Sequence, residues 1–254
     1  MTSVNGSETV TVVGRHPVAE LLALAPAMVH RVHVAASARG GGLDALIAAA
    51  EAAAVTVEVV NDRRLDSLAG GGGEHQGVVA TATLPLPAGL DGWLADRRGR
   101  PVALLVIDGV TTPANLGIVL RTAVAVGVDG VVVPDVGTAG LGSATLKASA
   151  GVALTAPVLR ATTIDDVVEC LQRHAVEIVA FDAGGDDLFT AELPRRAAYV
   201  VGNESVGISR VVRVGAAVTV ALKMAPGVES LNVAAAASVL LYELARRGLT
   251  DPGS

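Results

Sequence analysis

Five polar side chains in this sequence are candidates for chemistry, because each follows an apolar run that is typical of a buried strand. Together they supply a guanidinium, a carboxylate, a hydroxyl and two amides, which are groups that bind anionic and hydrogen-bonding ligands. The five residues are Asn115, Arg121, Glu204, Ser230 and Asn232.

The apolar runs that precede these residues are 102–107, 198–201 and 218–222. Continuous β-branched and aliphatic runs of this length favour strands buried in a parallel sheet. In open α/β sheets, ligands bind at the carboxyl ends of the strands. We therefore expect the loops that follow the three runs to form one site.

Each candidate also has a purely structural explanation. Asn115 stands where a helix N-cap belongs, Ser230 could cap the last helix, and Glu204 could be a carboxylate in a first helical turn. Arg121 could extend to solvent from the exposed face of a helix. That explanation is weakest for Arg121, whose neighbours are Leu, Val, Ala and Thr, because a guanidinium is not buried unpaired.

The apolar pattern of the second half predicts an α/β fold with a parallel sheet. After the run at 102–107, the sequence predicts a loop, a helix from 116 and a strand at 131–133, which make a β-α-β unit. Strands and helices then alternate, with a short strand at 177–181 and a last helix at 232–247.

The domain organisation follows from composition along the chain. The sequence pattern of residues 1–84 predicts a small α/β module in which strands alternate with short helices. Residues 85–101 are rich in Pro, Gly and Arg, which is typical of a linker, so 102–254 forms the second predicted domain.

Composition excludes several classes of site. The single cysteine, Cys170, rules out an internal disulfide and a Cys-rich metal centre, and the five scattered histidines form no metal-ligand pair, so we expect no metal. The sequence also contains no phosphate-binding G-x-x-x-x-G-K-[ST] loop, no dinucleotide-binding G-x-G-x-x-G and no G-x-S-x-G elbow. We see no secretory signal and no apolar run long enough for a membrane span, and we expect a cytoplasmic protein.

Three motifs of the second half occur in an order that is specific to one family. They are IDGVTTPANLGIVLRTAVAVGVDGVVV, YVVGNESVGIS and VALKMAPGVESLNVAAAASVLLYE, between residues 107 and 243. The sequence resembles the SpoU (TrmH) group of SPOUT RNA ribose 2′-O-methyltransferases. VVGRHPVAELL and EHQGVVA in the first half resemble the L30e-like RNA-binding module of the bacterial 23S rRNA guanosine 2′-O-methyltransferase branch.

The resemblance implies a C-terminal trefoil knot, a homodimer and S-adenosylmethionine as cofactor. Gly202, Leu222, Met224 and Leu231 would line the cofactor site. Asn115, Arg121, Glu204, Ser230 and Asn232 would form the catalytic set, and Lys147 and Ser149 would lie near the substrate phosphate.

The implied reaction moves a methyl group from a sulfonium to a ribose hydroxyl, so the protein must orient the hydroxyl and help to remove its proton. Arg121 is the residue to which the family's activation of the hydroxyl is attributed, but a guanidinium is a poor base because its pKa exceeds about 12. We expect Arg121 to hold the phosphate beside the target ribose, with Asn115 and Glu204 fixing the guanidinium.

The chain departs from the family pattern at four positions. The family commonly has Pro at Lys223, a Gly one place before Gly227, Ser at Ala234 and Gly at Ser205. These differences bear on the shape of the pocket more than on the reaction.

The charge of the chain is unusual for an RNA-binding protein. The formal net charge is −6 and aromatic residues make up 2% of the chain, so RNA recognition would depend on a local arginine patch and on RNA shape. The patch would comprise Arg15, Arg39, Arg63, Arg64, Arg97, Arg98 and Arg100. Two alternatives remain open: a methyltransferase that acts on a small molecule, and an RNA-binding assembly factor without activity.

Overall fold

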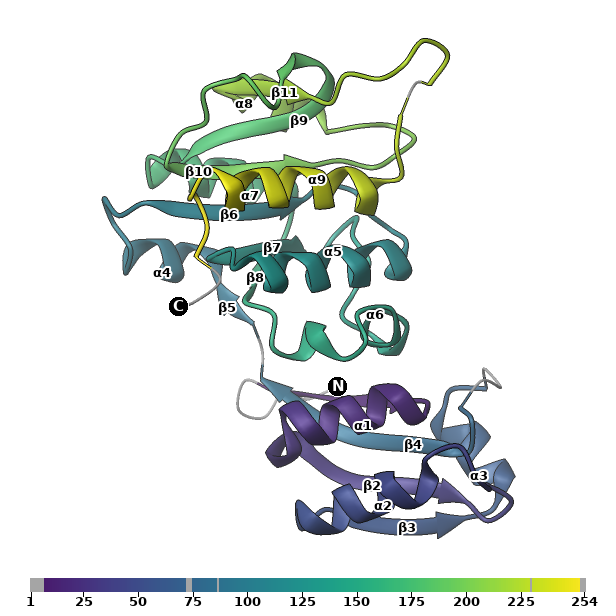
Figure 1. Cartoon of the computed structure of the whole chain (residues 1–254). Helices are drawn as coiled ribbons and strands as arrows, with labels where there is room; N and C mark the ends of the chain where they lie inside the picture. The colour runs from purple at the N-terminus through teal and green to yellow at the C-terminus, as the bar shows by residue number, and fades with distance from the viewer. Residues whose placement is uncertain (1–6, 72–74, 86, 229, 252–254) are drawn as a thin grey trace. The chain divides into compact units, whose positions relative to one another are not determined.

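The computed structural model describes residues 7–71, 75–85, 87–228 and 230–251 and divides into two compact units (Figure 1). Unit 1 comprises Met1–Leu86 and Leu141–Thr155, and unit 2 comprises Pro87–Gly140 and Ala156–Ser254. The segment Leu141–Thr155 therefore belongs to unit 1, although it lies within the sequence of the second half.

Unit 2 is built on one parallel sheet, as the apolar runs predicted. The strand order is β11-β9-β10-β6-β7-β8-β5, and every neighbouring pair is parallel. The strands are β5 (Ala88–Gly89), β6 (Val102–Ile107), β7 (Gly130–Pro134), β8 (Val158–Ala161), β9 (Glu177–Asp187), β10 (Arg196–Val201) and β11 (Val218–Ala221). The strands β6, β7 and β10 lie within the sheet and are almost wholly buried, which explains their continuous apolar sequences.

Helices cover both faces of this sheet. They are α4 (Leu90–Ala95), α5 (Pro113–Val126), α7 (Ile164–Arg173), α8 (Arg210–Gly215) and α9 (Val233–Arg246). Side chains alternate along β6, so Val102, Leu104 and Val106 join one core with α4, α7 and α8. Helices α5 and α9 lie side by side in Figure 1, and a hydrogen bond of 3.2 Å joins Thr122 Oγ1 and Ser238 Oγ between them.

The segment predicted as a linker, 85–101, carries secondary structure of its own. Its strand β5 pairs with β8 at the edge of the sheet, and α4 buries Leu90 and Leu94 in the core of unit 2. The prediction of a plain linker was wrong because the frequent Pro and Gly residues conceal two leucines at helical spacing.

Strand β9 is much longer than the predicted strand at 177–181. It runs for 11 residues, and its register with β11 shifts between Thr219, which pairs with Ala180, and Val220, which pairs with Asp186. The strand was predicted too short because two glycines in this stretch interrupt the apolar pattern that is typical of strands. One of them, Gly185, has no room for a Cβ atom, which would lie 2.5 Å from the backbone nitrogen of Val220.

Unit 1 contains a four-stranded sheet with the order β1-β4-β2-β3, in which only β2 and β3 are parallel. Its elements are β1 (Ser7–Val13), α1 (Arg15–Leu24), β2 (Val29–Ala35), α2 (Leu43–Ala52), β3 (Thr56–Val60), α3 (Asp62–Leu68), β4 (Val78–Pro85) and α6 (Ser143–Ala148). Two short 3-10 turns, Pro26–Met28 and Val152–Leu154, complete it. No helix in the described part of the chain has the length and apolarity needed to cross a membrane.

Candidate active site

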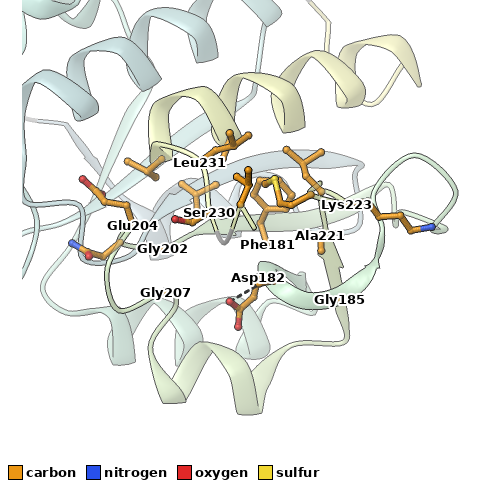
Figure 2. A pocket seen from close by; sticks show the side chains of 18 residues that line it. Phe181, Asp182, Gly185, Gly202, Glu204, Gly207, Ala221, Lys223, Ser230 and Leu231 are labelled. Carbon is orange, nitrogen blue, oxygen red and sulfur yellow. Dashed lines mark hydrogen bonds between the residues drawn. The ribbon is translucent and has the colours of Figure 1, made fainter. Parts of the chain in front are cut away.

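Unit 2 contains a cavity of about 450 Å³ at the carboxyl ends of β10 and β11, beside the middle of β9. This volume falls within the range of about 300–1,000 Å³ that is typical of small-molecule sites. Six of the nine residues predicted for the site line it: Gly202, Glu204, Leu222, Met224, Ser230 and Leu231. Figure 2 shows Glu204 near one end of the cavity and Lys223 near the other.

One wall of the cavity comes from β9, a strand in which the sequence predicted no site residue. Phe181, Asp182, Ala183 and Gly185 line it, at the place where the register with β11 shifts. Such an irregularity redirects side chains out of the regular ladder. The carboxylate of Asp182 accepts two hydrogen bonds from Arg213 on α8, at 3.2 and 2.8 Å, so its charge is paired.

A tight turn after β10 forms a second wall. The backbone nitrogen and oxygen of Asn203 each pair with Gly207, at 3.1 and 2.8 Å, and this closes the turn. A Cβ atom on Gly202 would lie 2.4 Å from the carbonyl carbon of Gly207. A residue larger than glycine at 202 would therefore force the turn apart.

A chain of three side chains joins the beginning of α9 to this turn. The Oδ1 atom of Asn232 accepts hydrogen bonds from the backbone nitrogens of Ala234 and Ala235, at 2.9 and 3.4 Å. Its Nδ2 atom donates to Asn115 Oδ1 at 3.1 Å, and Asn115 Nδ2 donates to Glu204 Oε1 at 3.0 Å. Three residues that are far apart in the sequence, and that were predicted to share a site, therefore lie together.

The structural explanations of Asn115 and Ser230 as helix caps do not hold. Helix α5 begins at Pro113 after the N-cap Thr112, so Asn115 lies inside the first turn with 8% of its surface exposed. The helix begins earlier than its apolar pattern because proline suits the first helical position. The cap of α9 is Asn232 rather than Ser230, because a short polar side chain must lie directly before the helix to reach its free N–H groups.

Arg121 lies outside the group formed by the other polar residues. It is exposed on α5, and its guanidinium makes no hydrogen bond or ion pair with any residue that the structure describes. The expected contacts of the guanidinium with Asn115 and Glu204 are not formed in this single chain, where those two residues bond to each other.

Lys147 and Ser149, the two residues expected near the substrate phosphate, belong to unit 1. The Ser149 hydroxyl is fully buried, donates to Leu146 O at 3.0 Å and accepts from the backbone nitrogen of Ala153 at 3.1 Å. This hydroxyl is therefore committed to its own turn, and the expected nearness of Lys147 and Ser149 to a substrate phosphate stays a prediction.

Two arginines of the predicted patch hold loops of unit 1 together. Arg15 donates to the backbone oxygens of Gln76, at 2.7 Å, of Arg39, at 3.0 Å, and of Gly40. Arg39 donates to the backbone oxygens of Ala36 and Ala38, at 2.8 and 2.6 Å. These guanidinium groups therefore have a structural role, which the sequence pattern did not reveal.

One cluster of possible metal ligands lies away from the cavity. In the described part of the chain, Asp91, Cys170 and His174 bring their ligand atoms within 4.8 Å of one another. Asp91 Oδ1 already accepts from Arg173 at 2.6 Å, His174 at 2.9 Å and Cys170 at 3.7 Å, so hydrogen bonding accounts for the cluster. Burial raises the pKa of the Cys170 thiol to about 11, which disfavours the thiolate that binds metals.

Profiles of two protein families match the chain. The profile described as SpoU rRNA Methylase family matches residues 103–242, which include every residue of the cavity. The profile described as RNA 2′-O ribose methyltransferase substrate binding matches residues 11–87.

Relatives and solved structures extend the similarity to almost the whole chain. The 23S rRNA (guanosine-2′-O-)-methyltransferase RlmB of Bordetella pertussis is 37% identical over 95% of this chain and 98% of its own. The SpoU methyltransferase AviRb of Streptomyces viridochromogenes, in complex with AdoMet, is 25% identical with a TM-score of 0.70, covering 96% of this chain and 91% of its own. An AdoMet-bound rRNA methyltransferase of Sinorhizobium meliloti is 25% identical with a TM-score of 0.71, covering 96% and 88%.

Proposed function

The chain belongs to the SpoU rRNA methylase family, and we propose that its cavity is where it carries out the reaction of that family. The protein is an enzyme that transfers a methyl group from S-adenosylmethionine to a ribose 2′-hydroxyl of RNA. Its substrate is a guanosine of 23S rRNA, and the observation that carries this conclusion is the near full-length similarity to RlmB. The same similarity favours RNA over a small-molecule acceptor and an enzyme over an inactive assembly factor.

The residues of the cavity fit the cofactor. Phe181, Leu222 and Leu231 offer apolar surface for an adenine ring, and the backbone around Met224 and Ser230 offers polar groups for the ribose. Because Gly202 has no side chain, the turn after β10 can stay closed and form one wall of the cavity. When bound, S-adenosylmethionine supplies the methyl group as an electrophile on a sulfonium sulfur.

The chain's own residues then have to orient the acceptor hydroxyl and assist its deprotonation. Glu204 ends the polar chain at the edge of the cavity, and its carboxylate has only one hydrogen bond, from Asn115, among the described residues. The remaining oxygen is able to accept a hydrogen bond from a hydroxyl placed there. We assign that role to Glu204 and a supporting role to Asn115 and Asn232.

Arg121 is assigned to the phosphate beside the target ribose. Its guanidinium is exposed and makes no bond in the described part of the chain, so it is available for a bidentate contact with an anion. An adjacent cation also favours the ionised form of the hydroxyl. Arg121 acts in this account through charge and position, and it does not accept the proton.

We also propose that the enzyme is a homodimer that pairs through α5 and α9. These helices pack on each other, yet Ile118 and Tyr242 remain 44% and 60% exposed on them. Large apolar side chains on two adjacent helices are typical of a face that another subunit covers. Arg121 lies on the same helix as Ile118, so a partner subunit could complete its surroundings.

Two finer features of the fold are proposals as well. The C-terminal chain leaves β11 at the edge of the sheet and returns to pack α9 on α5, the helix that follows the more central β6. This return path supports a trefoil knot. The mixed four-stranded sheet and short helices of unit 1 support an L30e-like module that binds the RNA.

Calorimetry tests the cofactor site without requiring activity. Gly202→Ala should weaken binding of S-adenosylmethionine at least about tenfold, because the added methyl group forces apart the turn that forms one wall of the cavity. Gly184→Ala is the matched control, since a Cβ atom there meets nothing within 4 Å, and it should bind normally. Equal affinity in both variants would place the cofactor elsewhere.

The acceptor is tested with labelled S-adenosylmethionine and rRNA from cells that lack this modification. Label should enter the RNA but not a DNA oligonucleotide of the same sequence, which has no 2′-hydroxyl. Arg121→Ala should reduce incorporation by about 10²-fold or more, as expected for a residue that stabilises the reacting group by charge. Undiminished activity of Arg121→Lys would contradict a bidentate role for the guanidinium.

A further inference from the structure

We propose that Asn203 is a positioning residue that holds the Glu204 carboxylate against Asn115. This inference rests on the proposed function, because it concerns the reaction of the same site. Asn203 was not among the residues that the sequence pointed to, and it is one of the residues that line the cavity. Asn203 takes part in two sets of hydrogen bonds, and a third set orients the Asn115 amide toward Glu204.

The first set fixes the shape of the turn. Asn203 Oδ1 accepts hydrogen bonds from the backbone nitrogens of Ser205, at 2.8 Å, and Val206, at 3.3 Å. Its backbone nitrogen and oxygen pair with Gly207. An asparagine side chain that accepts hydrogen bonds from the following backbone nitrogens stabilises a turn. The turn that carries Glu204 is therefore held by the side chain of Asn203.

The second set joins this turn to the loop after β6. Asn203 Nδ2 donates to the backbone oxygen of Gly109 at 2.9 Å. Gly109 has φ +73°, a conformation that favours glycine, so its carbonyl is presented by a backbone shape specific to this position. A few residues further on, the same connection enters α5, which carries Asn115. Asn203 therefore sets the separation between the two loops whose side chains meet at Glu204 and Asn115.

The third set determines which way the amides face. Because Asn232 Oδ1 caps α9, its Nδ2 must donate, and Asn115 has to present its oxygen to Asn232 and its nitrogen to Glu204. Glu204 can only accept in this arrangement. The contact is useful only if the turn keeps the carboxylate within reach of Asn115, and Asn203 supplies that constraint.

Other contacts preserve the sheet when Asn203 is changed. Strands β10 and β6 pair along their whole lengths, and the backbone nitrogen of Asp108 donates to Val201 O at 2.9 Å. The Asp108 carboxylate accepts from the backbone nitrogen of Ser209 at 2.5 Å. Loss of the Asn203 side chain should therefore loosen the turn while the fold remains intact.

Kinetics of two variants separate the functions of the side chain. Asn203→Ala loses the side-chain bonds to Ser205 and Val206 as well as the link to Gly109. The value of kcat for rRNA methylation should fall about 10²-fold, the loss that follows from a small misplacement of a reacting group. Asn203→Asp keeps the acceptor for Ser205 and Val206 but loses the donor, and kcat should fall about tenfold. KM for the RNA should change by less than about threefold in both. Wild-type kcat in Asn203→Asp would overturn the link to Gly109.

A double-mutant cycle tests whether Asn203 acts through Glu204. If it does, adding Asn203→Ala to Glu204→Gln should reduce kcat by less than about threefold further, because the group that is positioned is already impaired. Fully multiplicative losses would overturn the proposal. Thr163→Ala removes a comparable side-chain cap from α7, far along the chain from the site residues, and should lower the unfolding temperature without lowering kcat.

A structural measurement decides the question even if rRNA proves to be the wrong substrate. In a crystal structure of Asn203→Ala, the contact between Asn115 Nδ2 and Glu204 Oε1 should be broken while β6 and β10 remain paired. An intact contact at about 3 Å would overturn the positioning role whatever the activity. Inactive wild-type enzyme with a broken contact in the variant would instead fault the assigned substrate.

Discussion

The two ends of α9 carry polar clusters of different chemical groups. At its beginning, two neutral amides lead from the helix cap of Asn232 through Asn115 to an exposed carboxylate, Glu204. At its end, a buried carboxylate, Glu243, is surrounded by the guanidinium groups of Arg246 and Arg247.

The cluster at the end of α9 is arranged to hold structure in place. Glu243 is only 4% exposed, and its oxygens accept hydrogen bonds of 2.6 and 2.7 Å from the two arginines. Arg247 also donates to the backbone oxygens of Leu188 and Ala191, each at 2.6 Å. The helix is thereby fastened to the segment that follows β9.

The difference shows how one helix serves two purposes. A buried charge that is fully paired fixes a position but cannot easily change partner or proton without a large penalty. A carboxylate held by one neutral amide keeps a free oxygen and its reactivity. We infer that the beginning of α9 supports catalysis and that its end supports the fold.

Glu204→Gln should have the largest effect of the changes that probe this comparison. The amide keeps an oxygen for Asn115 but loses the charge, so kcat should fall about 10²-fold, as is typical when a general acid–base group is removed. The free energy of unfolding should stay within about 0.5 kcal/mol, because the side chain is exposed. Denaturant unfolding and single-turnover methyl transfer measure the two quantities on one preparation.

Glu243→Gln should show the opposite pattern. Replacing the carboxylate leaves two arginines beside a neutral amide, which should lower the free energy of unfolding by about 1–3 kcal/mol. Activity per folded molecule should remain close to wild type. A loss of kcat as large as that of Glu204→Gln, measured at a temperature where both variants are folded, would erase the distinction between the two ends.

The pH dependence of stability sharpens the same contrast. The hydrogen bond from Arg246, followed by that from Arg247, lowers the pKa of Glu243 from 4.5 to about 2. A carboxyl whose folded pKa is depressed stabilises the fold above its unfolded pKa and loses that contribution as pH falls through the folded value. The difference in unfolding free energy between wild type and Glu243→Gln should be constant above about pH 5 and shrink from there towards pH 2. A difference that is independent of pH would mean that the charge does not provide the stabilisation.

The smallest effect is expected in the middle of α9. Ser238 donates to Ala234 O at 2.7 Å and shares a hydrogen bond of 3.2 Å with Thr122 on α5. Ser238→Ala should cost less than about 1 kcal/mol, since the two bonds that it removes are neutral and only partly buried. Urea unfolding would detect a larger value, which would mean that the helix is held along its length rather than at its ends.

The sequence predicted the parts of this site that depend on buried strands. The runs that became β6 and β10 are apolar on both faces, so their ends, and with them Asn115 and Glu204, could be located. The residues expected to bind the cofactor came from resemblance to the family and not from the pattern, and all four line the cavity: Gly202, Leu222, Met224 and Leu231.

Other parts of the site could not be predicted because tertiary pairing determines them. The sequence pattern ended this strand at 181, whereas pairing of Asp186 and Asp187 with β11 extends β9 through its two glycines with an irregular register. Asn203 appeared to be one polar residue in a turn, and its contact with Gly109 crosses 94 residues of sequence. Local sequence patterns cannot predict a contact between residues that are so far apart in the sequence.

The most direct test of the whole account locates the transferred methyl group. The enzyme is incubated with labelled S-adenosylmethionine and unmodified 23S rRNA, and the RNA is digested to nucleosides. The account predicts label in 2′-O-methylguanosine for wild type and for folded Glu243→Gln, with about 10²-fold less for Glu204→Gln. The account would be contradicted by label on a base, by the absence of label from the RNA, or by equal label from all three proteins.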